Sequence, residues 1–205
     1  MNQKSAVRAF FALPPHLVEL VRTTAGAFAV LLAVGFTLGS LRPEAVEPLM
    51  RMFTNAAAGA GLYQVEGASL MALILANNLF SLLLVIAGGL VPFLRLPAFS
   101  LGLNALLIGG LAAFYQREGL GLAAYFAGTL PHAFTELGAL VLACAAGLYL
   151  CRAVSNTLLG SGNARAVATV LSQCLRVYVH WVLPLLAVSA FLEAFVTPLI
   201  FRQFL

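Results

Sequence analysis

The stretch Leu130–Glu136 reads LPHAFTE and places a histidine and a carboxylate in a segment that is otherwise almost entirely apolar as far as Leu150. Pro131 lacks a backbone N–H, which costs nothing in the first turn of a helix, so we expect a helix to begin there. His132 and Glu136 then lie four residues apart on one face of that helix. Ionisable groups at membrane depth are expensive and usually face a bundle interior, a cavity or a partner. The pair is therefore a candidate site.

Small residues continue this face at Ala139, Ala143 and Gly147. They would allow a neighbouring helix to approach closely. Gly35 and Gly39 have the same small-residue spacing, and they too predict close helix packing. Dimerisation through this pair is a weaker alternative.

The composition is that of a polytopic membrane protein. Apolar residues make up 62% of the chain, charged residues only 9%, and the mean hydropathy is +1.00. Soluble domains carry roughly 25% charged residues. The basic residues are scattered and are not clustered with aromatic residues, which argues against nucleic acid as a partner. We expect an N-terminal cytoplasmic or interfacial segment over residues 1–22 and one transmembrane helical domain over residues 23–205.

Three cysteines, an odd number, lie in or beside apolar segments. They do not suggest a disulfide framework, and a free cysteine behaves as a small hydrophobic residue. We therefore interpret Cys144, Cys151 and Cys174 as packing residues. The start Met1–Lys4 does not resemble a signal peptide, so we expect no cleavage there.

Apolar stretches of suitable length predict an all-α bundle of about five transmembrane helices. The expected spans are about 24–41, 71–90, 98–115, 131–150 and 177–201. Pro131 breaks the fourth segment, whose first part, 122–129, is expected to form a short helix or half-helix. Counting that part separately gives six spans.

The connections carry further expectations. Residues 49–62 predict a short helix that lies on the surface or re-enters the membrane, and residues 152–176 predict a polar loop. Pro184 predicts a kink in the last span. The tight link from Pro92 to Pro97 predicts that the second and third spans form an antiparallel hairpin.

Positive residues predict the orientation in the cell inner or plasma membrane. With a cytoplasmic N-terminus, seven basic residues fall inside and four outside. The inner set is Lys4, Arg8, Arg22, Arg95, Arg152, Arg165 and Arg176, and the outer set is Arg42, Arg51, Arg117 and Arg202.

Polar residues within four spans lie in the same half of the membrane. By the rise per helical residue, His132 and Glu136 lie roughly 3–9 Å below the outer end of their span, and Glu193 about 12 Å below. The predicted outer-leaflet pocket consists of His132, Glu136, Glu193, Asn78, Asn104, Asn77 and Thr197. Two carboxylates in a low dielectric cannot both ionise cheaply, so a proton, His132 or a cation should compensate them. Alternatively, the asparagines only join helices by hydrogen bonds.

These residues resemble those of the stage II sporulation protein M family of integral membrane proteins. The resemblance covers roughly residues 70–200 and rests on Asn77-Asn78, Asn104, Pro131-His132-x-x-x-Glu136 and the LEAFVTP ending over Leu192–Pro198. Ala133 and Ala105 stand where family members often have glycine. The namesake acts with two other membrane proteins, one of them a peptidoglycan hydrolase, in remodelling the septal wall during engulfment.

The resemblance implies an integral membrane scaffold with membrane protein partners in the lipid bilayer; a homo-oligomer is a further option. Two alternatives stay open: a cation- or proton-linked transporter component, and an intramembrane metal-dependent hydrolase. His132, Glu136 and Glu193 are candidate zinc ligands, so a metal ion is the cofactor that the sequence suggests. The chain has no HExxH motif and no P-loop, and we assign no catalytic residue.

Overall fold

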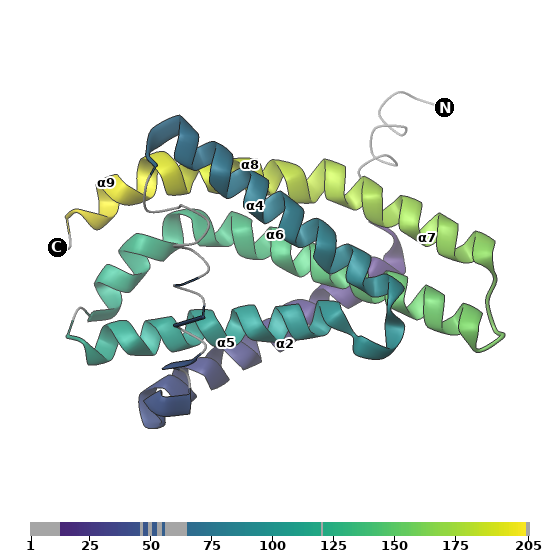
Figure 1. The fold of residues 1–205 in the computed structure, drawn as a ribbon, viewed down its shortest axis with the longest axis horizontal. Coiled ribbons are helices and arrows are strands. Elements are labelled where there is room, and N and C mark those ends of the chain that lie inside the picture. Colours follow the sequence, from purple (N-terminus) through teal and green to yellow (C-terminus); the bar gives the residue numbers. More distant parts are fainter. Residues whose placement is uncertain are drawn as a thin grey trace.

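The computed structural model describes residues 13–45, 47–48, 51–52, 55, 65–119 and 121–203. Within these residues the chain consists of helices joined by short connections, without strands (Figure 1). In this described part of the chain, five helical segments are long and apolar enough to cross a membrane: Pro15–Leu41, Gly67–Leu90, Pro92–Arg117, Gly121–Leu158 and Ala164–Ile200. The predicted all-α membrane bundle is therefore confirmed. The helix expected over 49–62 lies outside the described residues, apart from three helical positions at 51–52 and 55.

Helix α2 (Pro15–Leu41) packs mainly against α5 (Leu96–Arg117), and glycine makes the close approach possible. A Cβ atom at Gly35 would lie 2.6 Å from the carbonyl oxygen of Leu106, and one at Gly109 would overlap the carbonyl of Leu32. The small residues of α2 therefore pack within the chain. The helix starts well before residue 24, because Pro15 fits its first turn and Leu17 is fully buried.

Helix α4 (Gly67–Ala87) is followed by two short 3₁₀ turns, Gly88–Leu90 and Pro92–Leu94, before α5 begins. Arg95 has a left-handed backbone, with φ of 44°, at the entry to α5. Despite this tight link, α4 and α5 make little contact with each other; α4 packs on α6 (Gly121–Leu158) and on the last helices. The two helices diverge because glycine and alanine positions on α6 offer α4 a closer surface.

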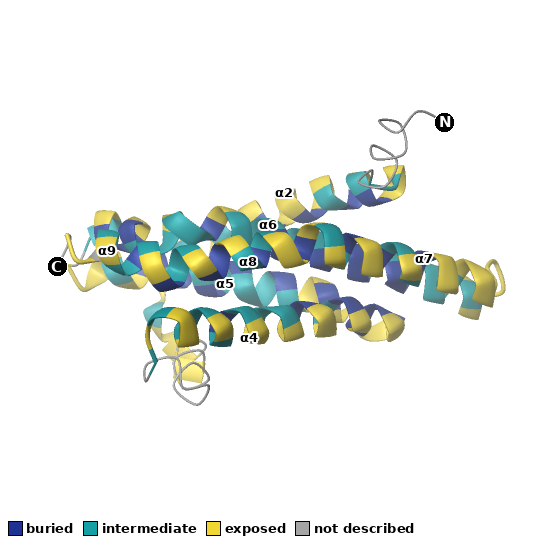
Figure 2. Ribbon diagram, turned by 90° about the horizontal axis from the view of Figure 1, so that it is seen from above, coloured by how far each residue is buried: buried dark blue, intermediate teal, exposed yellow. Residues whose placement is uncertain are grey.

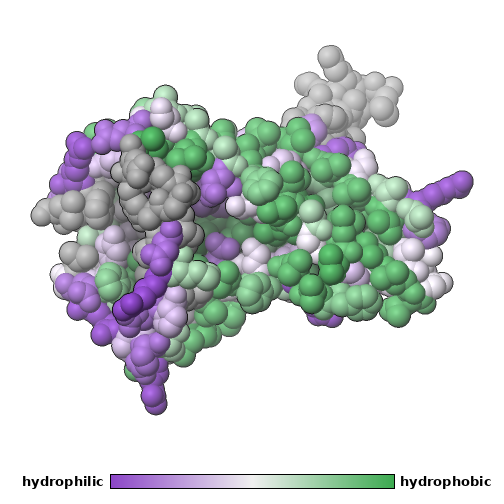
Figure 3. All heavy atoms as spheres, viewed as in Figure 1, coloured by the Kyte–Doolittle hydropathy of each residue, from purple (hydrophilic) through white to green (hydrophobic). Residues whose placement is uncertain are grey.

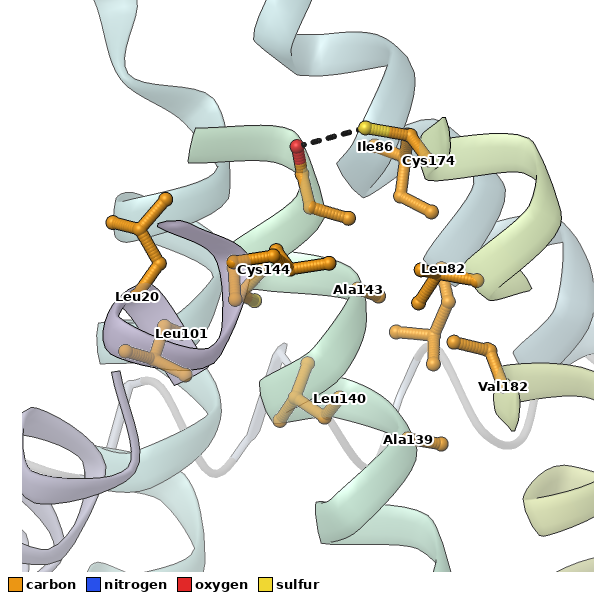
Figure 4. Packing of buried hydrophobic residues seen from close by; sticks show 14 of the residues in the cluster. Leu20, Leu82, Ile86, Leu101, Ala139, Leu140, Ala143, Cys144, Cys174 and Val182 are labelled. Atoms are coloured by element: carbon orange, nitrogen blue, oxygen red, sulfur yellow. Dashed lines mark hydrogen bonds between the residues drawn. The ribbon is translucent and has the colours of Figure 1, made fainter. Parts of the chain in front are cut away.

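Helix α6 runs through the centre of the bundle. Its small residues Ala139, Ala143 and Gly147 are buried, and Figure 4 shows two of them among the larger core side chains. Pro131 lies inside this helix and not at its start, so the predicted break is a bend within one continuous helix (Figure 1). Proline removes one backbone hydrogen bond and crowds the carbonyl four residues before it, which bends a helix without ending it.

The polar loop predicted over 152–176 is wrong. Helix α6 continues to Leu158, and α7 (Ala164–Val177) folds back against it after a turn in which Gly160 has a positive φ of 78°. The Asn163 side chain accepts a hydrogen bond from the N–H of Ala166 at 2.9 Å and caps the new helix. Because α7 has a low mean hydropathy, its amphipathic pattern was not recognised from the sequence. The buried residues of this pattern are Val170, Cys174 and Val177.

The last segment continues without a break through α8 (Leu183–Phe191) and α9 (Thr197–Phe201), with two π-helical turns, Tyr178–Val182 and Leu192–Val196. Each π turn ends two residues before a proline, Pro184 or Pro198. A wider turn relieves the clash between the proline ring and the carbonyl four residues before it. At Pro184, where the sequence predicts a kink, the structure has a π turn directly before the proline-containing helix.

Large apolar side chains cover much of the outer surface. Phe134, Phe99 and Val30 are 78%, 67% and 64% exposed, while buried residues face the interior of the bundle (Figure 2). Figure 3 shows hydrophobic residues over a broad part of one face. In water such a surface would favour aggregation, whereas in a bilayer it contacts lipid tails. The protein is embedded in a membrane.

Candidate functional site

Three ionisable side chains meet where α6 passes the last π turn. Potential ligand atoms of His132, Glu136 and Glu193 lie within 4.8 Å of one another, and all three residues are partly buried. In the described part of the chain, no other group of three histidine, cysteine or acidic residues is close enough to hold a metal ion. We call these residues the HEE cluster.

The orientation of His132 is set by the C-terminal segment. Its Nδ1 atom lies 3.1 Å from the Thr197 hydroxyl oxygen, and its Nε2 atom lies 3.9 Å from Oε2 of Glu136. If Nδ1 carries the proton and donates it to Thr197, the lone pair of Nε2 points toward the cluster. The imidazole side chain is only 13% exposed, so packing also restricts it.

Glu136 is held from a third helix. The Asn78 amide nitrogen donates to Oε1 of Glu136 at 3.4 Å, which leaves Oε2 on the side of His132. Asn77 lies farther from the HEE cluster than Asn78 does. It is exposed, and its amide nitrogen donates to Oδ1 of Asn78 at 3.4 Å. The first asparagine therefore supports the second without facing the HEE cluster itself.

Glu193 is placed by the π turn Leu192–Val196. The N–H of Thr197 bonds the carbonyl of Leu192 across this widened turn. One full turn earlier along α8, the buried Ser189 donates to the carbonyl of His132 at 3.4 Å. The stripe of Ser189, Glu193 and Thr197 thus faces α6, and π-bulges are frequently found at such sites.

A cavity of about 770 Å³ lies beside the cluster, between α4, α5 and α6. Asn104 lines it, and its amide nitrogen donates to the Ser100 carbonyl of its own helix at 2.9 Å. The structure therefore brings six of the seven predicted site residues to this cavity: Asn78, Asn104, His132, Glu136, Glu193 and Thr197. Asn77 is not among its lining residues.

Four polar residues of the cavity wall lie outside the predicted set: Ser81, Ser100, Tyr115 and Thr129. Thr129 lies three residues before His132, on the same helix face, so the helical period could have found it. Tyr115 stands at the end of α5, and nothing in its sequence surroundings sets it apart. His180, which lies elsewhere on the last segment, does not line the cavity.

The HEE cluster has the donor set of a three-ligand zinc site, with one nitrogen and two carboxylate oxygens. Two hydrogen bonds support the candidate ligands in the way that is usual in metal sites. The Thr197 hydroxyl contacts the second nitrogen of His132, and the Asn78 amide donates to the second carboxylate oxygen of Glu136. The arrangement can also hold a proton between carboxylates, or pair an imidazolium with Glu136.

Comparison with known proteins yields one match. The family model described as Stage II sporulation protein M matches residues 23–198, which is most of the chain. No curated protein matches, and no solved structure matches.

Proposed function

This chain belongs to the stage II sporulation protein M family, and on that premise we propose that it is a membrane assembly protein whose HEE cluster binds a divalent cation. The observation that carries the proposal is the approach of three ligand atoms to within 4.8 Å of one another. They come from α6 and from the end of the chain, so a cation there would join two segments that are distant in sequence.

Zinc fits the donor atoms better than magnesium or calcium does. Imidazole is a good ligand for zinc, whereas the two harder cations prefer oxygen ligands throughout. Tetrahedral bonds of about 2.1 Å would place the ligand atoms roughly 3.4 Å apart. The side chains therefore need to close by about 1–1.5 Å from their present positions, which small rotamer changes can supply.

We assign the cation a structural role in assembly. By tying the π turn Leu192–Val196 to α6, it would fix the surface that the following helix α9 presents to membrane protein partners. The namesake activity of the family, assembly with other membrane proteins, is consistent with such a role. We further propose a plasma membrane location with the N-terminus in the cytoplasm, supported by the distribution of Lys and Arg.

The packing favours this role over transport of a cation. A transport path has to continue from the HEE cluster along the helices to the far side of the membrane. On one side of the cavity, however, the bundle is tightly filled: a Cβ atom at Gly147 would lie 2.6 Å from Cγ of Pro97 and 2.9 Å from the carbonyl oxygen of Val85. Leu150, one turn further along α6, is fully buried.

The composition of the cavity wall also favours a structural site over a hydrolase. A zinc hydrolase generally needs an acid or base in addition to the metal ligands. Among the described residues that line the cavity, Tyr115 is the only ionisable side chain outside the HEE cluster. Both nearby carboxylates are already used as candidate ligands.

Metal analysis of the purified protein tests the proposal. We expect about one zinc per chain in the wild type and at least tenfold weaker zinc binding in His132→Ala, consistent with the loss of one of three ligands. His16→Ala is the matched control, because His16 is exposed at the start of α2. Equal zinc content in the wild type and in His132→Ala would refute the proposal.

A further inference from the structure

The cavity beside the HEE cluster is much larger than a metal ion requires. Its volume is about 770 Å³, whereas one water molecule takes up about 30 Å³ in the liquid. Along α5 its wall extends from Ser100 to Tyr115, which corresponds to about 22 Å of helix. One leaflet of the hydrocarbon core is only about 15 Å thick. The cavity is therefore long enough for an acyl chain.

Seven polar side chains outside the HEE cluster also line the cavity, but a large part of its wall consists of aliphatic side chains. Three helices contribute them: Leu82 and Val85 from α4, Ile108 and Leu111 from α5, and Leu137 and Leu140 from α6. Water is poorly accommodated against this aliphatic part of the wall, because it finds no hydrogen-bond partner there. An apolar chain makes dispersion contacts with all of these walls.

Two of the three helices that border this cavity, α4 and α5, would face lipid tails in the membrane. The cavity separates α4 from α5, which make little direct contact. Their outer faces carry exposed apolar side chains, such as Phe80 on α4 and Phe99 on α5, 63% and 67% exposed. Figure 3 shows hydrophilic residues near the middle of one face, next to a broad hydrophobic area. A membrane amphiphile is therefore the molecule most available to fill the space.

The HEE cluster indicates which head group of an amphiphile would fit at the polar end of the cavity. Three protein ligands leave the fourth position of a tetrahedral zinc ion open. Without a cation, Glu136 and Glu193 would repel an anion; with zinc bound, the site attracts an oxygen anion such as a phosphate. The aliphatic walls and the cluster thus suit the two ends of one ligand.

We propose that the cavity binds an anionic phospholipid, with one acyl chain along the aliphatic walls and a phosphate oxygen at the open position of the cation held by the HEE cluster. This inference rests on the proposed function, because it needs the cation. Binding of cation and lipid should therefore be coupled, and each should raise the affinity for the other by the same factor.

Native mass spectrometry of the full chain in detergent tests the inference. The zinc-loaded protein is incubated with phosphatidylglycerol, with diacylglycerol of the same chains, or with inorganic phosphate. We expect one phosphatidylglycerol to be retained per chain, with retention of diacylglycerol and of inorganic phosphate at least tenfold weaker, a difference of about 1.4 kcal/mol. Removal of zinc by a chelator should release the phospholipid.

A cavity-filling variant separates this site from the metal site. Ile108→Trp places a bulky ring in the aliphatic part, and Val30→Trp adds the same ring on the exposed face of α2 as a control. We expect Ile108→Trp to keep zinc and lose the phospholipid, and Val30→Trp to keep both. Zinc without phospholipid in the wild type would overturn this inference alone, and so would equal retention of diacylglycerol. Absence of zinc from the wild type would overturn the proposed function as well.

Discussion

The Nδ1 atom of His132 lies 3.1 Å from the hydroxyl oxygen of Thr197, a residue 65 positions further along the chain. This contact joins the middle of α6 to the first residue of α9. When Nδ1 carries the proton and donates it to the threonine, Nε2 is left free for a ligand. The last helix thereby takes part in the candidate site through a residue that is not itself a ligand.

Thr197→Val should weaken zinc binding by about 10–100-fold, the usual effect of losing a second-shell partner. Valine keeps the shape of threonine but offers no oxygen to His132, so the ring is free to rotate. Zinc titration of the purified variant measures the effect. Thr135→Val is the control, because the Thr135 hydroxyl donates to the carbonyl of His132 on its own helix at 2.9 Å. Equal zinc affinities of the two variants would contradict the assigned role.

Glu193→Gln should lower thermal stability in the presence of zinc but not in its absence. In the metal-free protein, the substitution relieves the crowding of two carboxylates and raises or preserves the melting temperature. With zinc at 100 times its dissociation constant, the wild type gains about 2.7 kcal/mol, and the variant loses most of this gain. Melts in chelator and in zinc measure both effects, with the exposed Glu19→Gln as control. A downward shift of equal size under both conditions would exclude metal binding at Glu193.

Gly109→Ala should destabilise the bundle by about 1–3 kcal/mol, the usual cost of overpacking. The added methyl group would overlap the backbone of α2 at Leu32, which cannot give way as a side chain can. Gly26→Ala is the matched control: a Cβ atom there meets nothing within 4 Å, and the change should stabilise the helix by about 0.5–1 kcal/mol. Thermal melts in detergent compare the two. Similar melting temperatures would mean that α2 and α5 are not packed so closely in the membrane.

Residues 118 and 161 should react with a membrane-impermeant thiol reagent from opposite sides of the membrane. Both positions are exposed, and α6 runs between them over 38 residues, about 57 Å of helix against a hydrocarbon core of about 30 Å. The native cysteines are buried and should not react. Labelling of Glu118→Cys from outside and of Ser161→Cys from inside would support a cytoplasmic N-terminus. Labelling of both from one side would exclude five spans.

Local sequence signals predicted the class of fold and most of the spans, because length and apolar content decide both. They also indicated that Asn78, His132 and Glu136 would face inward, since these residues could not face lipid cheaply, but Asn77, predicted with them, is exposed. The bend at Pro131 and the helix after Asn163 were missed for a different reason. Whether a proline ends a helix or bends it depends on packing with neighbouring helices, and an amphipathic helix of low hydropathy resembles a loop.

The divergence of α4 from α5 was equally hidden from the sequence. A tight link normally joins neighbouring helices, but here the closest surface for α4 lies on α6. Glycine at position 89 packs against the backbone of Gly147, and Gly88 lies beside Leu96, so the link stays compact while the helices separate. The cavity follows from that separation, and only a tertiary arrangement reveals it.

Pro198→Ala should weaken zinc binding by about tenfold or more while the protein stays folded, comparable to the loss of a second-shell partner. The π turn before Pro198 lets Ser189 on α8 and Thr197 on α9 both contact His132. Alanine has an N–H that can bond the carbonyl of Ala194, so the turn can tighten to a regular α-helix. In a regular α-helix Ser189 and Thr197, which are eight residues apart, would point about 80° away from each other. They could then no longer both contact His132, and Thr197 would be lost as its partner. Zinc titration measures the loss, and Pro15→Ala, at the start of α2, is the control. Unchanged zinc affinity in Pro198→Ala would show that the π turn does not position the site.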